Sequence, residues 1–216
     1  MSGTGMMEAQ SGDSADLRTA PRYSLILRTA KLLCEGGEYV CVVRDVSESG
    51  VRVRLYHDCP PDRFLALELG NGDRFAMERM WQNGNEAGFR FSASIDVDAF
   101  IEEPNDLPRR PVRLRVQRPA LVTARGRDIH AMLVDLSQQG GCVEAGSQIP
   151  LKQQVRVELA GMPVRFGHVC WRRGFTHGLV FQQGFRLDEF ARLAFAVQPF
   201  AVTEGVPRDQ RIARFV

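Results

Sequence analysis

The chain has 216 residues, of which 44% are hydrophobic and 25% charged, a composition typical of one large or two small globular domains. It has no apolar run near the roughly 20 residues that span a bilayer, which argues against membrane insertion. Residues 17–103 carry 11 Lys and Arg against 14 Asp and Glu, whereas residues 104–202 carry 14 against 7. The basic second half is therefore the stronger candidate for an anionic partner, or it docks on the acidic first half.

The first half reads as six short strands separated by Gly, Asn and Asp turns. Valine and leucine alternate with arginine over residues 51–55, the period of a half-buried strand. A short helix and a linker marked by two prolines follow. The predicted elements are Ser24–Leu33, Tyr39–Arg44, Val51–Leu55, Phe64–Leu69, Phe75–Trp81, Gly88–Phe91, the helix Asp96–Glu103, and the linker with Pro104 and Pro108.

The second half repeats this order. Its strands are predicted at Ile129–Val134, Val155–Leu159, Val164–Trp171 and His177–Phe181, and its helix at Leu187–Val197. Apolar residues at 187, 190, 194 and 197 form one stripe, as in an amphipathic helix.

A fixed sequence offset relates the two halves. Asp45, Ser47, Gly50, Trp81, Gly88 and Phe91 recur 90 residues later, and Arg28 recurs as Arg118. We infer a duplicated domain. The predicted fold is all-β, with two tandem six-stranded antiparallel barrels, each followed by a C-terminal helix. The predicted units are a disordered tail at 1–16, barrels at 17–103 and 104–202, and a C-terminal tail at 203–216.

Each copy begins with an arginine-rich, proline-containing arm. The first holds Arg18 and Arg22, and the second holds Arg109, Arg110 and Arg113. Guanidinium groups bind phosphate, or the O6/N7 edge of guanine, with two parallel hydrogen bonds.

Each copy also has an Asp-x-Ser-x-x-Gly turn between its second and third strands. The residues are Asp45, Ser47 and Gly50, and then Asp135, Ser137 and Gly140. The carboxylate and hydroxyl are suited to accept hydrogen bonds from purine N–H groups, and glycine permits a positive φ or close approach of a ligand. For such a turn alone, the alternative is an Asx-turn that closes a hairpin.

Arm and turn together, on a small barrel with a later Trp…Gly-x-x-Phe hairpin, resemble the PilZ family of bacterial cyclic di-GMP receptors. The resemblance covers both halves. It implies that the arms grip phosphate and guanine while the turns hold guanine edges. It also implies a cytoplasmic receptor or adaptor, not an enzyme, that responds to cyclic di-GMP by rearranging its two barrels and a partner surface.

Two other functions remain open. The barrels of a degenerate PilZ protein could be a ligand-independent interaction scaffold, and the basic second copy motivates a nucleic-acid-binding module, which its poorly interleaved aromatic residues disfavour. We find no Gly-rich phosphate loop, zinc-protease motif or G-x-S-x-G elbow. The basic C-terminal tail is a candidate contact for a protein partner or a second copy.

Several other residues are expected to be structural or solvated. The cysteines are expected to be reduced and at least partly buried. The scattered histidines are expected to be ordinary surface or hairpin residues and give no reason to expect a metal or other cofactor. The two tryptophans are predicted to pack. Arg52 and Arg54 are predicted to be solvated surface residues beside the turn, with extension of the site as the alternative. The cysteines are Cys34, Cys41, Cys59, Cys142 and Cys170, the histidines are His57, His130, His168 and His177, and the tryptophans are Trp81 and Trp171.

Overall fold

The computed structural model describes residues 23–103 and 111–198, with side chains from residue 28 onward. Four predicted arm residues lie outside the described side chains, as do the predicted tails and the two linker prolines. The four are Arg18, Arg22, Arg109 and Arg110. In the part of the chain that is described, no helix is long and apolar enough to cross a membrane.

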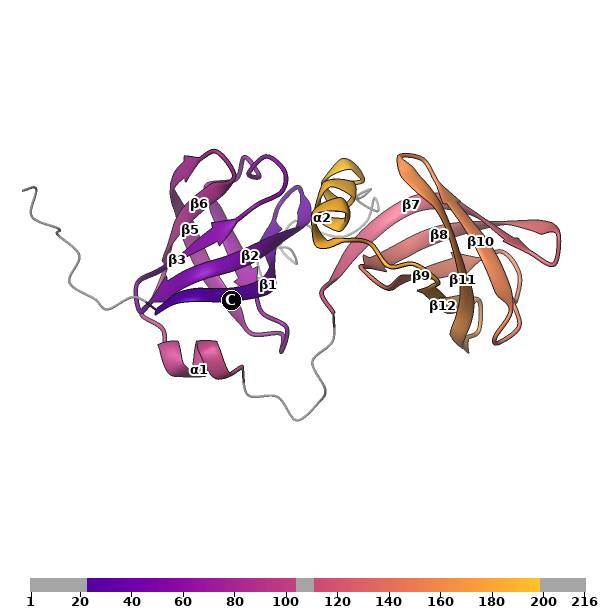
Figure 1. The fold of residues 1–216 in the computed structure, drawn as a ribbon, viewed down its shortest axis with the longest axis horizontal. Coiled ribbons are helices and arrows are strands. Elements are labelled where there is room, and N and C mark those ends of the chain that lie inside the picture. Colours follow the sequence, from indigo (N-terminus) through magenta and orange to yellow (C-terminus); the bar gives the residue numbers. More distant parts are fainter. Residues whose placement is uncertain (1–22, 104–110, 199–216) are drawn as a thin grey trace, which may run out of the picture.

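The first half is a closed six-stranded antiparallel barrel, barrel 1 (Figure 1). Its strands follow the order β1-β2-β3-β6-β5-β4 around the barrel, and the helix α1 comes after them. Their bounds are β1 Tyr23–Cys34, β2 Gly37–Ser47, β3 Gly50–Arg54, β4 Phe64–Glu68, β5 Arg74–Asn83, β6 Glu86–Phe91 and α1 Val97–Glu102.

The second half closes in the equivalent order, β10-β11-β12-β9-β8-β7, to form barrel 2. The predicted pair of barrels with C-terminal helices is thereby confirmed. The bounds are β7 Arg113–Ala124, β8 Arg127–Ser137, β9 Gly140–Ala145, β10 Gln154–Leu159, β11 Met162–Arg173, β12 Thr176–Phe181 and α2 Leu187–Ala196.

One arginine per copy ties each helix to its own barrel. Arg28 donates to the carbonyls of Phe100 (3.0 Å) and Ile101 (2.5 Å) in α1. Its counterpart Arg118 donates to the carbonyl of Val197 (2.8 Å), just after α2. The last carbonyls of a helix lack partners within the helix, so a guanidinium group there satisfies them and complements the helix dipole.

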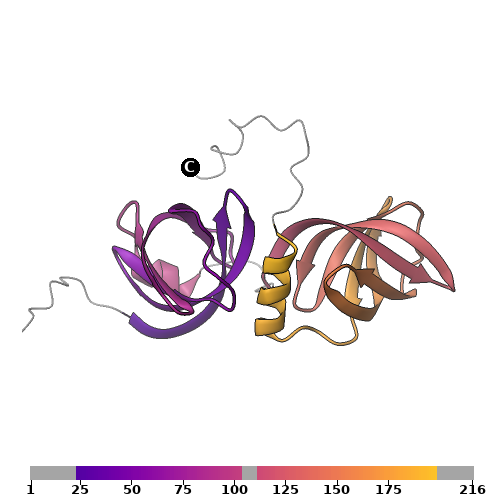
Figure 2. The ribbon, with the colours of Figure 1, turned by 90° about the horizontal axis from the view of Figure 1, so that it is seen from above.

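Helix α2 lies between the barrels (Figures 1 and 2). Its Phe190 and Ala194 are fully buried in the core of barrel 2, as the predicted stripe requires. Phe195 points to barrel 1, where its ring stacks on His57 with a centroid distance of 4.8 Å and contacts Tyr39 at 5.7 Å. One short helix therefore contributes to both cores.

A polar cluster continues this interface. The carboxylate of Glu38 in β2 accepts hydrogen bonds from the backbone N–H of Arg115 in β7 (2.8 Å) and from its Nε (2.5 Å). The amide of Gln198 donates to the carbonyls of Glu38 (3.2 Å) and Arg115 (3.0 Å). Glu38 is 4% exposed, so truncating it would leave buried donors without an acceptor.

The expectations for His57 and Cys170 were wrong, and that for His177 holds only in that the residue lies in the β11–β12 hairpin. His57 is an interface residue, and burial lowers its pKa. His177 is fully buried, and its Nε2 accepts a hydrogen bond from the backbone N–H of Ile149 (3.0 Å). This bond fixes the β9–β10 loop to β12. Cys170 is exposed instead of partly buried. Each difference depends on which face of a strand or loop meets a neighbouring segment, which the local pattern leaves open.

Candidate functional site

The arm and turn motifs of the second copy meet at one end of barrel 2. Arg113, the first residue of β7, lies opposite Ser137 at the end of β8. Its Nη1 donates to Oδ1 of Asp135 at 2.9 Å. Arg113 is therefore a strand residue, although the sequence suggested a flexible arm, and the two motifs are joined by an ion pair.

A β-bulge precedes the motif aspartate in both copies. The β8–β9 register shifts between Leu133 and Asp135, and the β2–β3 register shifts between Val43 and Asp45. A bulge adds one residue to a strand and changes the direction of the side chain that follows. The motif is thus built from two strand ends and a short turn, and the strands extend further than predicted.

The motif serine closes this turn. Ser137 is 2% exposed and its hydroxyl donates to the carbonyl of Gly140 at 3.1 Å. Ser47 does the same to Gly50 at 3.3 Å. The hydroxyl proton is used within the turn, while its lone pairs remain chemically able to accept a further hydrogen bond.

The motif glycine is required by a neighbouring strand. A Cβ atom on Gly140 would lie 2.0 Å from the carbonyl oxygen of Leu179 in β12, and one on Gly50 would lie 2.5 Å from that of Phe89 in β6. Neither glycine has a left-handed φ. In the described structure the glycine allows close strand approach and does not adopt the left-handed turn conformation that the sequence suggested, while ligand access at this position stays a prediction.

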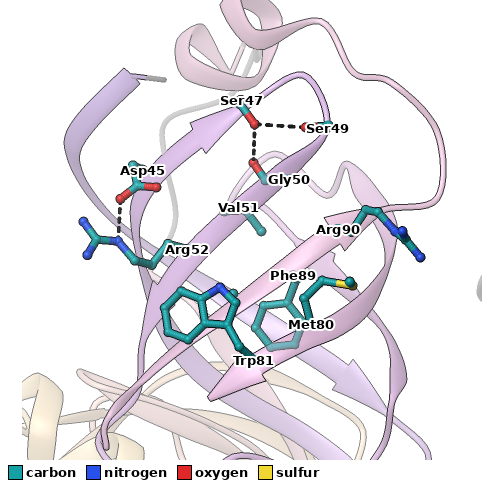
Figure 3. Close-up of a pocket in the computed structure, with 11 residues that line it drawn as sticks. Asp45, Ser47, Ser49, Gly50, Val51, Arg52, Met80, Trp81, Phe89 and Arg90 are labelled. Atoms are coloured by element: carbon teal, nitrogen blue, oxygen red, sulfur yellow. Dashed lines mark hydrogen bonds and ion pairs between the residues drawn. The ribbon is translucent and has the colours of Figure 1, made fainter. Parts of the chain in front are cut away.

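In barrel 1, the motif aspartate forms its ion pair with a different arginine. Arg52 Nε donates to Asp45 Oδ2 at 2.5 Å (Figure 3). Its Nη1 donates to Glu86 at 3.2 Å. The prediction that Arg52 is merely solvated is wrong, because Arg52 lies directly across the ladder from Asp45. Arg54, predicted to be solvated, is partly buried and lies over the Tyr56 ring at 5.6 Å.

A pocket of about 300 Å³ lies beside this pair. Figure 3 shows Trp81 next to Arg52, with Met80, Phe89 and Arg90 completing the wall. The Trp81 indole covers Gly88, as predicted for a packing residue, but 44% of the side chain is exposed. Sequence reasoning missed Met80 and Arg90 because no motif includes them and only the β5–β6 pairing brings them to the pocket.

A family model described as "PilZ domain" matches this chain twice, at residues 16–103 and 108–196. The chain belongs to the PilZ family. Both matched segments contain one closed barrel and one Asp-x-Ser-x-x-Gly motif. Among the curated proteins, none matches the chain.

Solved structures similar to this PilZ protein come from several bacteria. PlzA from Borreliella burgdorferi in complex with c-di-GMP is 12% identical, with a TM-score of 0.32, covering 79% of this chain and 88% of that one. YcgR from Escherichia coli in complex with c-di-GMP is 12% identical, with a TM-score of 0.31 and coverage of 87% and 86%. The Bacillus subtilis inhibitor of motility (MotI/DgrA) is 10% identical, with a TM-score of 0.32 and coverage of 79% and 95%.

The two PilZ domains differ in electrostatics at the motif aspartate. The position of Arg52 is taken by Cys142 in barrel 2, so Asp135 pairs with Arg113 instead. Burial raises the pKa of Asp135, and the Arg113 cation opposes this shift without cancelling it. Barrel 2 therefore holds an aspartate that accepts a proton at a higher pH than an exposed one.

This shift predicts a pH-dependent affinity for any ligand that donates hydrogen bonds to the Asp135 carboxylate. Because protonation removes an acceptor, affinity is expected to be constant well above the raised pKa and to fall as the pH approaches that pKa from above. Titrations across this range with wild type and Asp135→Asn check it. The variant is expected to bind more weakly and with a flatter profile, and a wild-type profile as flat as that of the variant would contradict the prediction.

Proposed function

We propose that this PilZ protein is a cyclic di-GMP receptor, with barrel 2 as its principal site. The observation that carries the proposal is the 2.9 Å contact between Arg113 of the arm and Asp135 of the turn. It joins a donor for phosphate or for the guanine O6/N7 edge to an acceptor for guanine N–H groups. Saturable binding of cyclic di-GMP tests the proposal.

Ligand binding exchanges partners at this ion pair. Arg113 turns from Asp135 to the ligand, and Asp135 accepts hydrogen bonds from the guanine edge. Arg109 and Arg110 are proposed to add further guanidinium contacts. Charge-assisted hydrogen bonds contribute about 1.5–3 kcal/mol each. Several of them offset the conformational entropy that is lost when an arm becomes ordered.

Barrel 1 is proposed as a weaker or purely structural copy. A ligand that used Asp45 would have to displace Arg52, whose Nε lies 2.5 Å from the carboxylate and whose Nη1 also reaches Glu86. Arg18 and Arg22 would supply the arm. Because Asp45 is already paired with Arg52, we favour a docking role for barrel 1. This is the ligand-independent interaction scaffold, restricted to one of the two copies.

Ligand binding is proposed to be transmitted through β7. This strand carries Arg113 at the site and, two residues on, Arg115, which contacts Glu38 of barrel 1. A change at the start of β7 therefore acts directly on the polar cluster between the barrels. We infer two arrangements of the barrels, with the ligand biasing the equilibrium between them.

Loss of the aromatic contact between the barrels is expected to mimic this effect. Phe195→Ala removes the stack on His57 and the contact with Tyr39, so its ligand-free scattering profile should shift toward that of the ligand-bound wild type. Phe64→Ala is the control, since Phe64 is 70% exposed. Small-angle scattering with and without saturating ligand makes the test. Identical wild-type profiles in the two states would refute the transmission, but not the receptor.

A further inference from the structure

One end of barrel 2, here called the distal tip, gathers three connections between strands. They are the β7–β8 turn at 125–126, the β9–β10 loop at 146–153 and the β11–β12 turn at 174–175. Arg125 Nε donates to Gln153 Oε1 (2.7 Å), and the backbone N–H of Ala145 donates to the carbonyl of Phe175 (3.0 Å). The β7–β8 hairpin projects away from barrel 1 (Figure 1). The distal tip lies at the opposite end of β7 from Arg113.

The distal tip is strongly basic. The cations in these connections and at the strand ends that flank them are exposed. None has an ion-pair partner among the residues that the structure describes: Arg125, Arg127, Lys152, Arg172 and Arg173. The acidic residues nearby are fewer. Asp128 accepts a hydrogen bond from the hydroxyl of Thr123 (2.7 Å), and Glu144 is exposed. Unpaired cations close together favour an anionic partner.

Apolar side chains project from the same connections. Phe175 is 58% exposed and Leu151 is 56% exposed, and Trp171, in β11 four residues before Phe175, is 43% exposed. The turns are short and fixed by strand pairing, since Arg173 pairs with Thr176 and Ala124 with Arg127. Presenting these side chains therefore costs little conformational entropy.

Barrel 1 shows that the fold does not require this surface. At the equivalent positions, 90 residues earlier, it has acidic, neutral or small residues: Glu35, Gly37, Pro61, Asp62, Gln82, Asn83 and Asn85. The same turns thus form without these five cations and without Leu151 and Phe175, whereas the exposed Trp171 has the equivalent Trp81 in barrel 1. The cluster of cations and the two exposed apolar residues of the turns therefore distinguish barrel 2 and need an explanation other than folding.

The geometry points to attachment of the distal tip to a membrane surface rich in anionic phospholipid. Guanidinium and ammonium groups meet lipid phosphates while apolar side chains enter the interface. Single-stranded nucleic acid is less well matched, because it is bound in grooves lined by stacking platforms, whereas these side chains project from turns. The inference does not depend on cyclic di-GMP binding.

Cosedimentation of the full chain with vesicles tests the attachment. Wild type is expected to bind vesicles containing phosphatidylglycerol and not those of phosphatidylcholine alone. Arg172→Gln/Arg173→Asn, which introduces the residues of barrel 1, should weaken binding roughly 25-fold, about fivefold per charge. Arg63→Gln/Arg192→Gln removes two exposed charges away from the distal tip, and its binding should stay within about twofold of wild type. Phe175→Asn should weaken binding roughly tenfold at unchanged charge.

Two results would overturn the attachment. The first is wild-type binding that is equal on both vesicle types. The second is an equal loss in the tip and control variants, which would indicate a general effect of net charge. The same proteins are then titrated with a random single-stranded oligonucleotide. Tip-dependent oligonucleotide binding without vesicle binding would assign the distal tip to nucleic acid and reject the membrane.

Discussion

Arg113→Ala is expected to weaken cyclic di-GMP binding at barrel 2 about a hundredfold. In the proposed site the side chain supplies two-pronged donors to phosphate or guanine, and losing them would remove about 3 kcal/mol of charge-assisted hydrogen bonding. The variant also releases Asp135, whose carboxylate then repels an anionic ligand. Titration calorimetry of wild type and variant measures the change in affinity directly.

Two companion variants separate this contact from general charge. Arg113→Lys keeps the charge and loses the fork, so it should recover only part of the affinity. Arg156→Ala removes an exposed arginine from the same barrel, away from the motif, and should bind like wild type. Wild-type affinity in Arg113→Ala would show that the site has been placed wrongly.

Gly140→Ala is expected to cost about 3 kcal/mol of unfolding free energy. Its Cβ would lie 2.0 Å from the Leu179 carbonyl oxygen, so β9 and β12 would have to separate or shift where they pair. Overpacking of this kind costs about 1–3 kcal/mol, and a backbone obstacle cannot change rotamer as a side chain does. Denaturant unfolding followed by tryptophan fluorescence or circular dichroism measures the loss.

Gly146→Ala is the matched control. Its Cβ would meet only the His130 carbonyl, at 3.6 Å, an ordinary contact, so stability should change by less than about 1 kcal/mol. If Gly140→Ala were as stable as the control yet lost ligand affinity, the glycine would serve ligand access instead of strand closure.

The sequence predicts the fold well because the signals that build it are local or repeated. The 90-residue offset identified the duplication, and the stripe at Phe190 and Ala194 identified the buried face of α2. The offset needs only a comparison of one half of the sequence with the other, and the stripe follows directly from the period of a helix that buries one face.

The candidate site was predicted only in part, because its contacts depend on register and docking. The arm and turn residues Arg113 and Asp135 were identified, but not their ion pair. The pairing of Arg52 with Asp45 requires the bulge in β2–β3, which no residue type signals. The stack of His57 on Phe195 depends on how α2 sits against the other barrel, information that lies in neither segment alone.

Titration calorimetry of the full chain with cyclic di-GMP, and with cyclic di-AMP as control, tests the central claim most directly. The two ligands share the phosphate ring and differ in their bases, so contacts with guanine edges discriminate between them. We predict saturable binding of cyclic di-GMP, at least tenfold tighter than that of cyclic di-AMP, with binding strongly reduced by Arg113→Ala. Absence of binding, or equal affinity for the two ligands, would contradict the proposed receptor site.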